Sequence, residues 1–294
     1  MSRLDIVNLH GYLFHKPQTI SDAKGRPISS TFSIRVIRRP LTSVTQQHLR
    51  IDVDCPVIWT RDPEQIKTIL TLEKGDMVDV RGVLTSREFV KQDNCPNCGH
   101  PVAREGNATF VTPLYICKRE HVEEEDSFLL LKSRAEISNR LEIIGNVCKG
   151  DDARADASGT PPYFYTDSKG RTYCQFQIAS ARSYRIPQDA DDQRTDFPWV
   201  KVYGKQAEAA NSALRVSSKV LLVGAIQTRR ISRQIRCGAC GEVFEKQEDV
   251  AEIVPSYIGY EADCIIPKSS HADGISEEED DPLKDVPLAG QEAV

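Results

Sequence analysis

Two pairs of cysteines have the spacing of metal ligands. Cys95 and Cys98 stand in CPNCG, and Cys237 and Cys240 stand in CGACG. Each pair places two thiolates on one tight turn before a glycine, which is the form of a zinc knuckle. The chain has nine cysteines, an odd number, and this spacing favours metal or redox chemistry over a disulfide framework. Because no helix begins there to lower a thiol pKa, we expect structural zinc rather than a redox pair.

A structural zinc site needs four ligands, and each knuckle supplies two. Cys117 and His121, or His100, can complete a set in the first half, whereas only Cys264 and His271 are available in the second. A competing arrangement joins both knuckles in one four-cysteine site, within the chain or between subunits, and a third holds no metal. We expect two separate sites, because hairpins of separate barrels should point away from each other. The predicted ligands are Cys95, Cys98, Cys117, Cys237 and Cys240.

The cysteine pairs belong to an internal repeat. Adding 142 to the residue number maps DCPVIWT, from Asp54, onto DFPWVKV, from Asp196, and VDVRGVLTSRE onto VLLVGAIQTRR. The same offset carries Gly82 to Gly224, Tyr115 to Tyr257, and the first cysteine pair to the second. One register kept over about sixty residues indicates two copies of one fold.

Each copy reads mainly as β-structure. Val78, Val80 and Leu84 alternate with polar residues, which is the pattern of a half-buried strand. A short helix is expected before this strand in each copy, with apolar faces at Ile66, Ile69 and Leu70, and at Ala207, Ala210 and Leu214. Three strands, a short helix and two strands joined by a long hairpin is the order of an OB-fold. We therefore expect an all-β dominated chain of two tandem five-stranded OB barrels, each with a zinc-knuckle hairpin between its last strands.

Length and charge suggest how the chain is divided. We predict a first OB domain over 1–132, a second over 133–268, and a disordered acidic tail over 269–294. The net charge of −5 misleads, because residues 276–294 carry seven acids and one lysine, which leaves the rest of the chain at +1. The basic residues of that nearly neutral body fall in clusters that can bind phosphates locally.

Four segments of the second copy resemble the bacterial-type single-stranded-DNA-binding proteins. They are NRLEIIGNV (139–147), CQFQIASARSYR (174–185), DFPWVKVYGKQAEAA (196–210) and KVLLVGAIQTRR (219–230). The resemblance covers residues 139–231 directly and 4–89 through the repeat, although the first copy has WTRDPEQIK in place of G-K-x-A-E and lacks the N-R start. It implies sequence-independent binding of single-stranded DNA in replication, repair, recombination or DNA transfer. The family usually assembles four OB barrels, so two per chain imply a homodimer.

Such binding needs a cationic groove for the backbone and flat side chains on which bases stack. Phe32 and Phe176 are expected in the cores instead. The predicted stacking residues are Trp59, Phe89, Tyr184, Phe197, Trp199 and Tyr203. The predicted phosphate contacts are Arg35, Arg38, Arg39, Arg87, Arg182, Arg185, Lys201, Lys205, Arg229 and Arg230.

No nucleotide-binding loop, H-E-x-x-H motif or repeated His–acid–nucleophile set is present, so we expect a binding protein and not an enzyme. The alternatives are an OB-fold accessory factor of a primosome or plasmid replication system, an RNA-binding OB protein, and a zinc-stabilised scaffold that binds protein only.

The acidic tail contains Asp285-Val286-Pro287-Leu288, which resembles the tail tip by which the family recruits replication and repair enzymes. A plain solubilising tail is the other interpretation. The sequence contains no long apolar stretch and no signal-peptide pattern at its start, so we expect a cytoplasmic chain without membrane contact.

Overall fold

The computed structural model describes residues 3–38, 52–149, 161–168, 170–182, 184 and 195–265. The first repeat runs through β1 (Asp5–Tyr12), β2 (Gln18–Ser21), β3 (Pro27–Ser33), β4 (Val36–Arg38), β5 (Asp52–Asp54), β6 (Val57–Thr60), α1 (Pro63–Ile69), β7 (Asp76–Asn94) and β8 (Pro101–His121). Two helices, α2 (Glu124–Ser133) and α3 (Ala135–Ser138), lie between the repeats. The domain boundary at residue 132 falls within α2 and stays a prediction.

The second repeat has a similar order of elements, with one strand fewer among its described residues. It comprises β9 (Asn139–Cys148), β10 (Tyr163–Thr166), β11 (Thr172–Ala181), β12 (Thr195–Asp196), β13 (Trp199–Tyr203), α4 (Gly204–Ala213), β14 (Lys219–Arg236) and β15 (Val243–Ala262). Strands dominate both repeats, as the sequence predicts. Among the described residues, no helix has the length and apolarity that a membrane span requires.

Each repeat closes into a small barrel. In the second, β9 pairs with β11, β11 with β13, β13 in parallel with β15, β15 with β14, and β14 again with β9. The first follows the same circuit through β3, β6, β8, β7 and β1, and a bridge between Tyr12 and Arg35 closes it. A parallel pairing of the third and fifth strands within a five-stranded barrel is OB topology.

The cores follow the predicted alternation. Val78, Val80 and Leu84 are buried, and Phe32 and Phe176 lie at 5% and 0% exposure inside their barrels, as expected. In α1, Ile66 and Ile69 face the core but Leu70 is 55% exposed, so the predicted third member of that face is wrong. Leu70 is the C-cap residue of α1, where the helix has already ended. Ala207, Ala210 and Leu214 of the second copy are all buried.

The repeated glycines have a shared structural cause. Register shifts in the ladders fall between Arg81 and Gly82 and between Val223 and Gly224. A Cβ at Gly224 would lie 2.3 Å from the carbonyl oxygen of Val254, and one at Gly82 would lie 2.3 Å from that of Thr112. Both barrels therefore need a residue without a side chain where the hairpin strand bulges.

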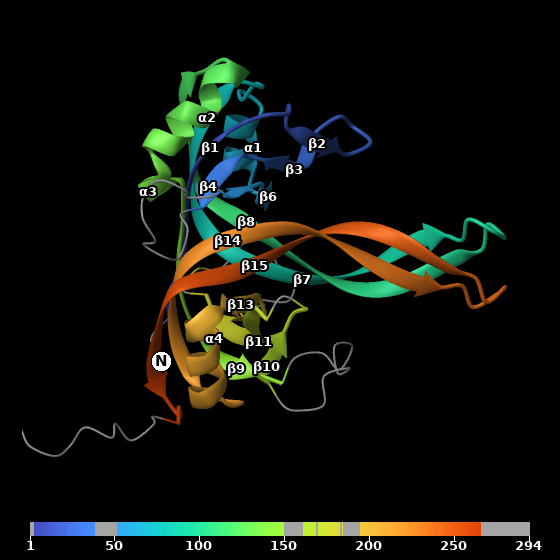
Figure 1. The fold of residues 1–294 in the computed structure, drawn as a ribbon. Helices are drawn as coiled ribbons and strands as arrows, with labels where there is room; N and C mark the ends of the chain where they lie inside the picture. The colour runs from blue at the N-terminus through green and yellow to red at the C-terminus, as the bar shows by residue number, and fades with distance from the viewer. Residues whose placement is uncertain are drawn as a thin grey trace, which may run out of the picture.

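The two barrels share one sheet. Strands β1 and β9 pair antiparallel, with Val7 opposite Leu141, so β15, β14, β9, β1, β7 and β8 form a continuous surface. The β7–β8 and β14–β15 hairpins run far beyond the barrels and lie side by side with their tips together (Figure 1). The expectation that the hairpins point away from each other is wrong. The pairing of β1 with β9 places the two hairpins so that both leave the barrels on the same side of the molecule (Figure 1).

Candidate nucleic-acid interface and metal centre

The outer face of the second barrel carries an aromatic and cationic cluster. In β13, Val200 and Val202 enter the core, so Lys201 and Tyr203 point outward. The Lys201 ammonium lies 4.3 Å from the ring centroid of Tyr173 and 5.5 Å from that of Tyr203. Tyr165 stacks on Tyr173 with centroids 5.0 Å apart. Flat rings beside a cation are the groups that bases and phosphates require.

The phenol of Tyr203 is fixed by its surroundings. Its hydroxyl donates a hydrogen bond of 3.1 Å to the side-chain oxygen of Gln227 on β14. Burial raises the pKa of Tyr203, so the ring stays neutral at physiological pH. The ring is thus held in place at the base of the β14–β15 hairpin, with its charge state settled before any ligand binds.

The first barrel has a different cluster in the corresponding place. Trp59 on β6 meets the ring of Phe110 edge-on, with centroids 5.3 Å apart. The guanidinium of Arg61 lies 5.2 Å from the Trp59 ring, and that of Arg87 lies 5.8 Å from it. The offset of 142 maps Trp59 onto Lys201, so the repeats place an aromatic and a cation at equivalent positions.

The other predicted stacking residues differ in exposure. Tyr184 is 46%, Phe89 39% and Phe197 36% exposed, whereas Trp199 is nearly buried at 9%. Lys205 is exposed in the first turn of α4. Arg39 and Arg185 lie outside the described residues.

Two predicted phosphate contacts pair with carboxylates of the chain itself. The prediction for buried Arg182 is wrong, and phosphate contact by Arg38 stays a prediction. Arg182 is 1% exposed, and its Nε lies 2.5 Å from the carboxylate of buried Asp196. The side chain of Arg38 is 10% exposed, and its Nε donates to Asp54 at 2.9 Å. The basic clusters of the sequence suggested a bound anion. In the structure, the carboxylates of Asp196 and Asp54 balance the charges of Arg182 and Arg38 instead.

These pairs belong to a reciprocal contact between the barrels. Asp54 of the first repeat accepts a hydrogen bond of 2.7 Å from the backbone N–H of Thr228 in the second. Asp196 of the second repeat accepts one of 2.8 Å from the N–H of Ser86 in the first. The repeated Asp-x-Pro element, DCP and DFP in the sequence, therefore fastens each barrel to the hairpin strand of the other.

Three further arginines are paired while remaining partly exposed. Arg35 meets Glu124 at 3.0 Å, and Arg230 meets Asp249 at 2.9 Å on the open surface. Arg229 holds the buried carboxylate of Glu252 with two hydrogen bonds, of 2.7 and 2.9 Å. Phosphate contact by these three residues stays a prediction.

The four knuckle cysteines meet at the hairpin tips. Their sulfur atoms all lie within 4.8 Å of one another. The Sγ atoms of Cys95 and Cys240 are 3.7 Å apart, as are those of Cys98 and Cys237. Zn–S bonds of about 2.3 Å place tetrahedral sulfurs about 3.8 Å apart, so the spacing suits a zinc-sized ion. The cluster is a candidate metal centre.

Two of these thiols have pKa values shifted in opposite directions. Backbone N–H groups of Cys240 and Ala239 lower the pKa of Cys237 to about 6, which favours the thiolate that a metal binds. At Cys98, a backbone N–H from His100 acts in the same direction, but contacts with the sulfur of Cys240 and the other thiols raise the pKa to about 12.

Cys117 is not among these ligands, and its prediction is wrong. It lies opposite Asp79 in the part of β8 within the barrel, and its Sγ contacts the carbonyl of Lys118. His121 lies 3.1 Å from the carboxylate of Asp76 instead. The sequence allowed the joined four-cysteine arrangement, but it did not show that the two hairpins lie side by side.

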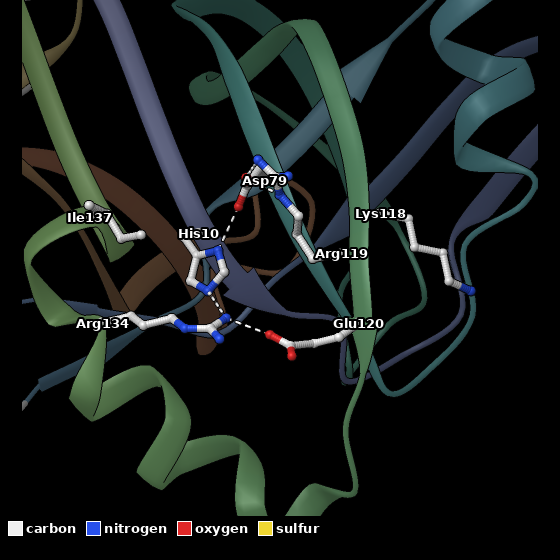
Figure 2. Close-up of a pocket in the computed structure, with 7 residues that line it drawn as sticks. All are labelled: His10, Asp79, Lys118, Arg119, Glu120, Arg134 and Ile137. Atoms are coloured by element: carbon white, nitrogen blue, oxygen red, sulfur yellow. Dashed lines mark hydrogen bonds and ion pairs between the residues drawn. The ribbon is translucent and has the colours of Figure 1, made fainter.

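A cleft of about 530 Å³ lies where α2 and α3 meet the first barrel (Figure 2). Its His10 lies between the carboxylate of Asp79, 2.5 Å from Nδ1, and the guanidinium of Arg134, 3.2 Å from Nε2. Arg134 also pairs with Glu120. The lining residues hold neither a hydroxyl nor a thiol nucleophile, and this network fastens the inter-repeat helices to β1, β7 and β8.

Sequence reasoning missed the partners of the predicted aromatics. They are Arg61, Phe110, Tyr165 and Tyr173. The sequence contained a signal for two of them, Tyr165 and Tyr173. Tyr163 and Tyr165 are two residues apart before the segment D-S-K-G, and Tyr173 follows it, as expected for tyrosines on one face of a hairpin. Phe110 and Arg61 are brought to Trp59 only by strand pairing.

The sequence profile of the single-strand binding protein family matches residues 138–239. The match covers the second barrel up to the start of its hairpin tip. The matched range spans β9 to β14 and includes Lys201, Tyr203 and Cys237, so the aromatic and cationic face lies within it. No curated protein matches the chain.

Solved structures extend this likeness to both repeats. The wild-type single-stranded DNA binding protein from Thermus aquaticus is 15% identical, with a TM-score of 0.54 over 89% of this chain and 95% of that chain. A deletion mutant of the same protein reaches 0.55 at 15% identity, over 91% of this chain and 100% of that one. At this identity the likeness shows the fold alone, and its coverage shows that the shared fold includes both repeats.

Proposed function

We propose that this chain binds single-stranded DNA without reading its sequence and protects it during replication, repair, recombination or DNA transfer. The observation that carries the proposal is the family match over the barrel that presents half-buried Tyr173, Tyr203 and Lys201 on one face. Rings offer stacking surfaces to any base, and the ammonium between them suits a phosphate. It acts as a binding protein and not an enzyme, in the cytoplasm where the DNA is.

The proposed binding surface has a part on each barrel. On the second it comprises Lys201 and Tyr203, with Tyr165 and Tyr173 as additions from the structure. On the first, Trp59 and Arg87 are central. The remaining proposed contacts are Phe89, Tyr184, Phe197, Trp199 and Lys205, with Arg35, Arg229 and Arg230 as paired cations that a phosphate can recruit.

Titration with dT oligomers of increasing length, rU oligomers and duplex tests the proposal. We expect tight binding to dT, weak binding to duplex, and affinity that falls steeply as salt rises, because neutralised phosphates release counterions. Lys201→Gln should flatten the salt slope, while Lys67→Gln on α1 serves as the matched control. Equal affinity for duplex, or a preference for rU, would replace the proposal by one of the alternatives.

We also propose that the four-cysteine centre holds structural zinc. Four thiolates at tetrahedral spacing satisfy zinc fully and leave no open position for a substrate. Elemental analysis of purified protein should find one zinc per chain. A content near two zinc ions per chain would contradict this proposal and support two separate sites.

The sheet shared by the barrels is the surface we propose for a homodimer. Its outer face exposes Tyr115 and Tyr257, at 54% and 57%, with half-buried Ile6, Ile144 and Val223 between them. A second copy packed there would cover these residues and bring four barrels together. The double variant Tyr115→Arg, Tyr257→Arg should halve the mass measured by sedimentation.

We also propose that the acidic tail, which lies outside the described residues, recruits replication or repair proteins.

A further inference from the structure

The distal parts of the two hairpins have almost no hydrophobic core of their own. Across 85–110 and 227–250, all of it described, the buried apolar side chains are Cys95, Ile235 and Cys237. Two of these three are knuckle cysteines. Strands this long, with exposed side chains on both faces, do not stay together by burial of apolar surface.

The two tips are built alike. In the first, the N–H of Cys95 donates to the carbonyl of His100, and that of Gly99 to the carbonyl of Cys95, both at 2.9 Å. In the second, Cys237 donates to Glu242 at 2.8 Å and Gly241 to Cys237 at 2.9 Å. Gly99 and Gly241 both take a positive φ, of 70° and 76°. Each tip thus offers two sulfurs in the same geometry and no more.

Between the tips and the barrels, the hairpins touch mainly through charged side chains. Glu248 of the second hairpin meets Arg104 and, at 3.4 Å, Lys91 of the first. Lys246 of the second lies 3.4 Å from Asp93 of the first. The side chains of Asp93 and Glu248 are only 4% and 13% exposed. Because burying these charges costs free energy that offsets much of their attraction, the pairs set the register of the contact more than its strength.

We propose that one metal ion, bound by two cysteines from each repeat, locks the two hairpins into a single arm, and that losing the ion opens the arm while both barrels stay folded. The proposal rests on the proposed zinc site, not on DNA binding. Because neither hairpin brings four ligands together by itself, neither can hold the ion alone. The ion also ties residue 95 to residue 240, and so fixes the ends of two elements whose bases belong to different barrels.

Hydrogen exchange on full-length protein tests the lock, with Co²⁺ substitution as the measure of metal binding. Cys95→Ser with Cys98→Ser should abolish the thiolate–cobalt absorption completely. It should also speed exchange in the untouched hairpin, 229–236 and 243–250, by about tenfold or more, with β1 and β9 unchanged. Cys117→Ser is the matched control and should alter neither signal.

Stripping zinc from the wild type with a chelator gives the same comparison without a mutation, and restoring zinc should restore protection. Retention of half the cobalt signal by the double variant would overturn the proposal, as would a metal-free wild type whose hairpins stay protected. Binding to short dT oligomers is measured in parallel. If the protein binds no dT yet loses and regains arm protection with zinc, the proposed DNA function fails and the lock stands.

Discussion

The buried carboxylate of Asp5, at the joint between the barrels, adds a pH dependence to the stability of the protein. Asp5 is 3% exposed, and its Oδ1 accepts a hydrogen bond of 2.9 Å from the N–H of Leu84. Its Oδ2 is buried without a hydrogen-bond partner. Burial raises the pKa of Asp5 from 3.8 to about 7, and the nearby charge of Asp196 adds to the effect.

The second repeat shows what this position accommodates better. Asn139, the equivalent residue in β9, accepts from the N–H of Ile226 at 3.0 Å and donates to its carbonyl at 2.8 Å. Asp5→Asn should make the same two bonds to Leu84. We therefore expect the substitution to stabilise the protein at pH 8, because it removes a buried charge and gives the second side-chain atom a partner.

The sign and size follow from linkage. The folded state holds the Asp5 proton up to about pH 7 and the unfolded state only to about pH 4, so this contribution to stability is full below pH 4 and is lost as pH rises through 7. Three pH units at about 1.4 kcal/mol each set a ceiling of about 4 kcal/mol. We expect a gain of about 1–3 kcal/mol at pH 8, shrinking by about 2 kcal/mol at pH 5.

Urea unfolding of wild type and Asp5→Asn at pH 5, 6, 7 and 8 measures this gain directly. Asn139→Asp is the matched reverse change and should destabilise the protein at pH 8 more than at pH 5. A gain that does not vary with pH, or a variant less stable than wild type at pH 8, would refute the argument that a desolvated charge sits at Asp5.

Three further predictions concern the binding face, the contact between the barrels and the repeated glycines. Tyr173→Ala and Tyr203→Ala should each weaken dT binding by about 1–3 kcal/mol in fluorescence titrations, with Phe128→Ala on α2 as a control without effect. Arg182→Ala should cost about 3–5 kcal/mol of stability at neutral pH by leaving Asp196 unpaired, and less at pH 5, since burial raises the Asp196 pKa to about 6; unchanged stability would mean that the pair is not buried. Gly224→Ala should cost about 1–3 kcal/mol in thermal unfolding, whereas Gly238→Ala, with open space around it, should cost little.

The sequence by itself determined the features that are local or periodic. Alternation of apolar residues set the strands, the offset of 142 set the two copies, and the spacing of Cys95 with Cys98 set a turn that presents two sulfurs. Phe176 in the core follows from the same alternation. These properties depend on neighbours along one strand or turn, so a single segment contains the information.

Tertiary structure alone decided which charges and which cysteines meet. Arg182 stands in a basic cluster of the sequence, yet the fold buries it against Asp196, and Cys117 is separated from Cys95 by most of a long hairpin. Cys95 and Cys240 are 145 residues apart in the chain and 3.7 Å apart in space. Their meeting depends on β1 pairing with β9, a contact between repeats whose strands carry the same pattern whether or not they pair.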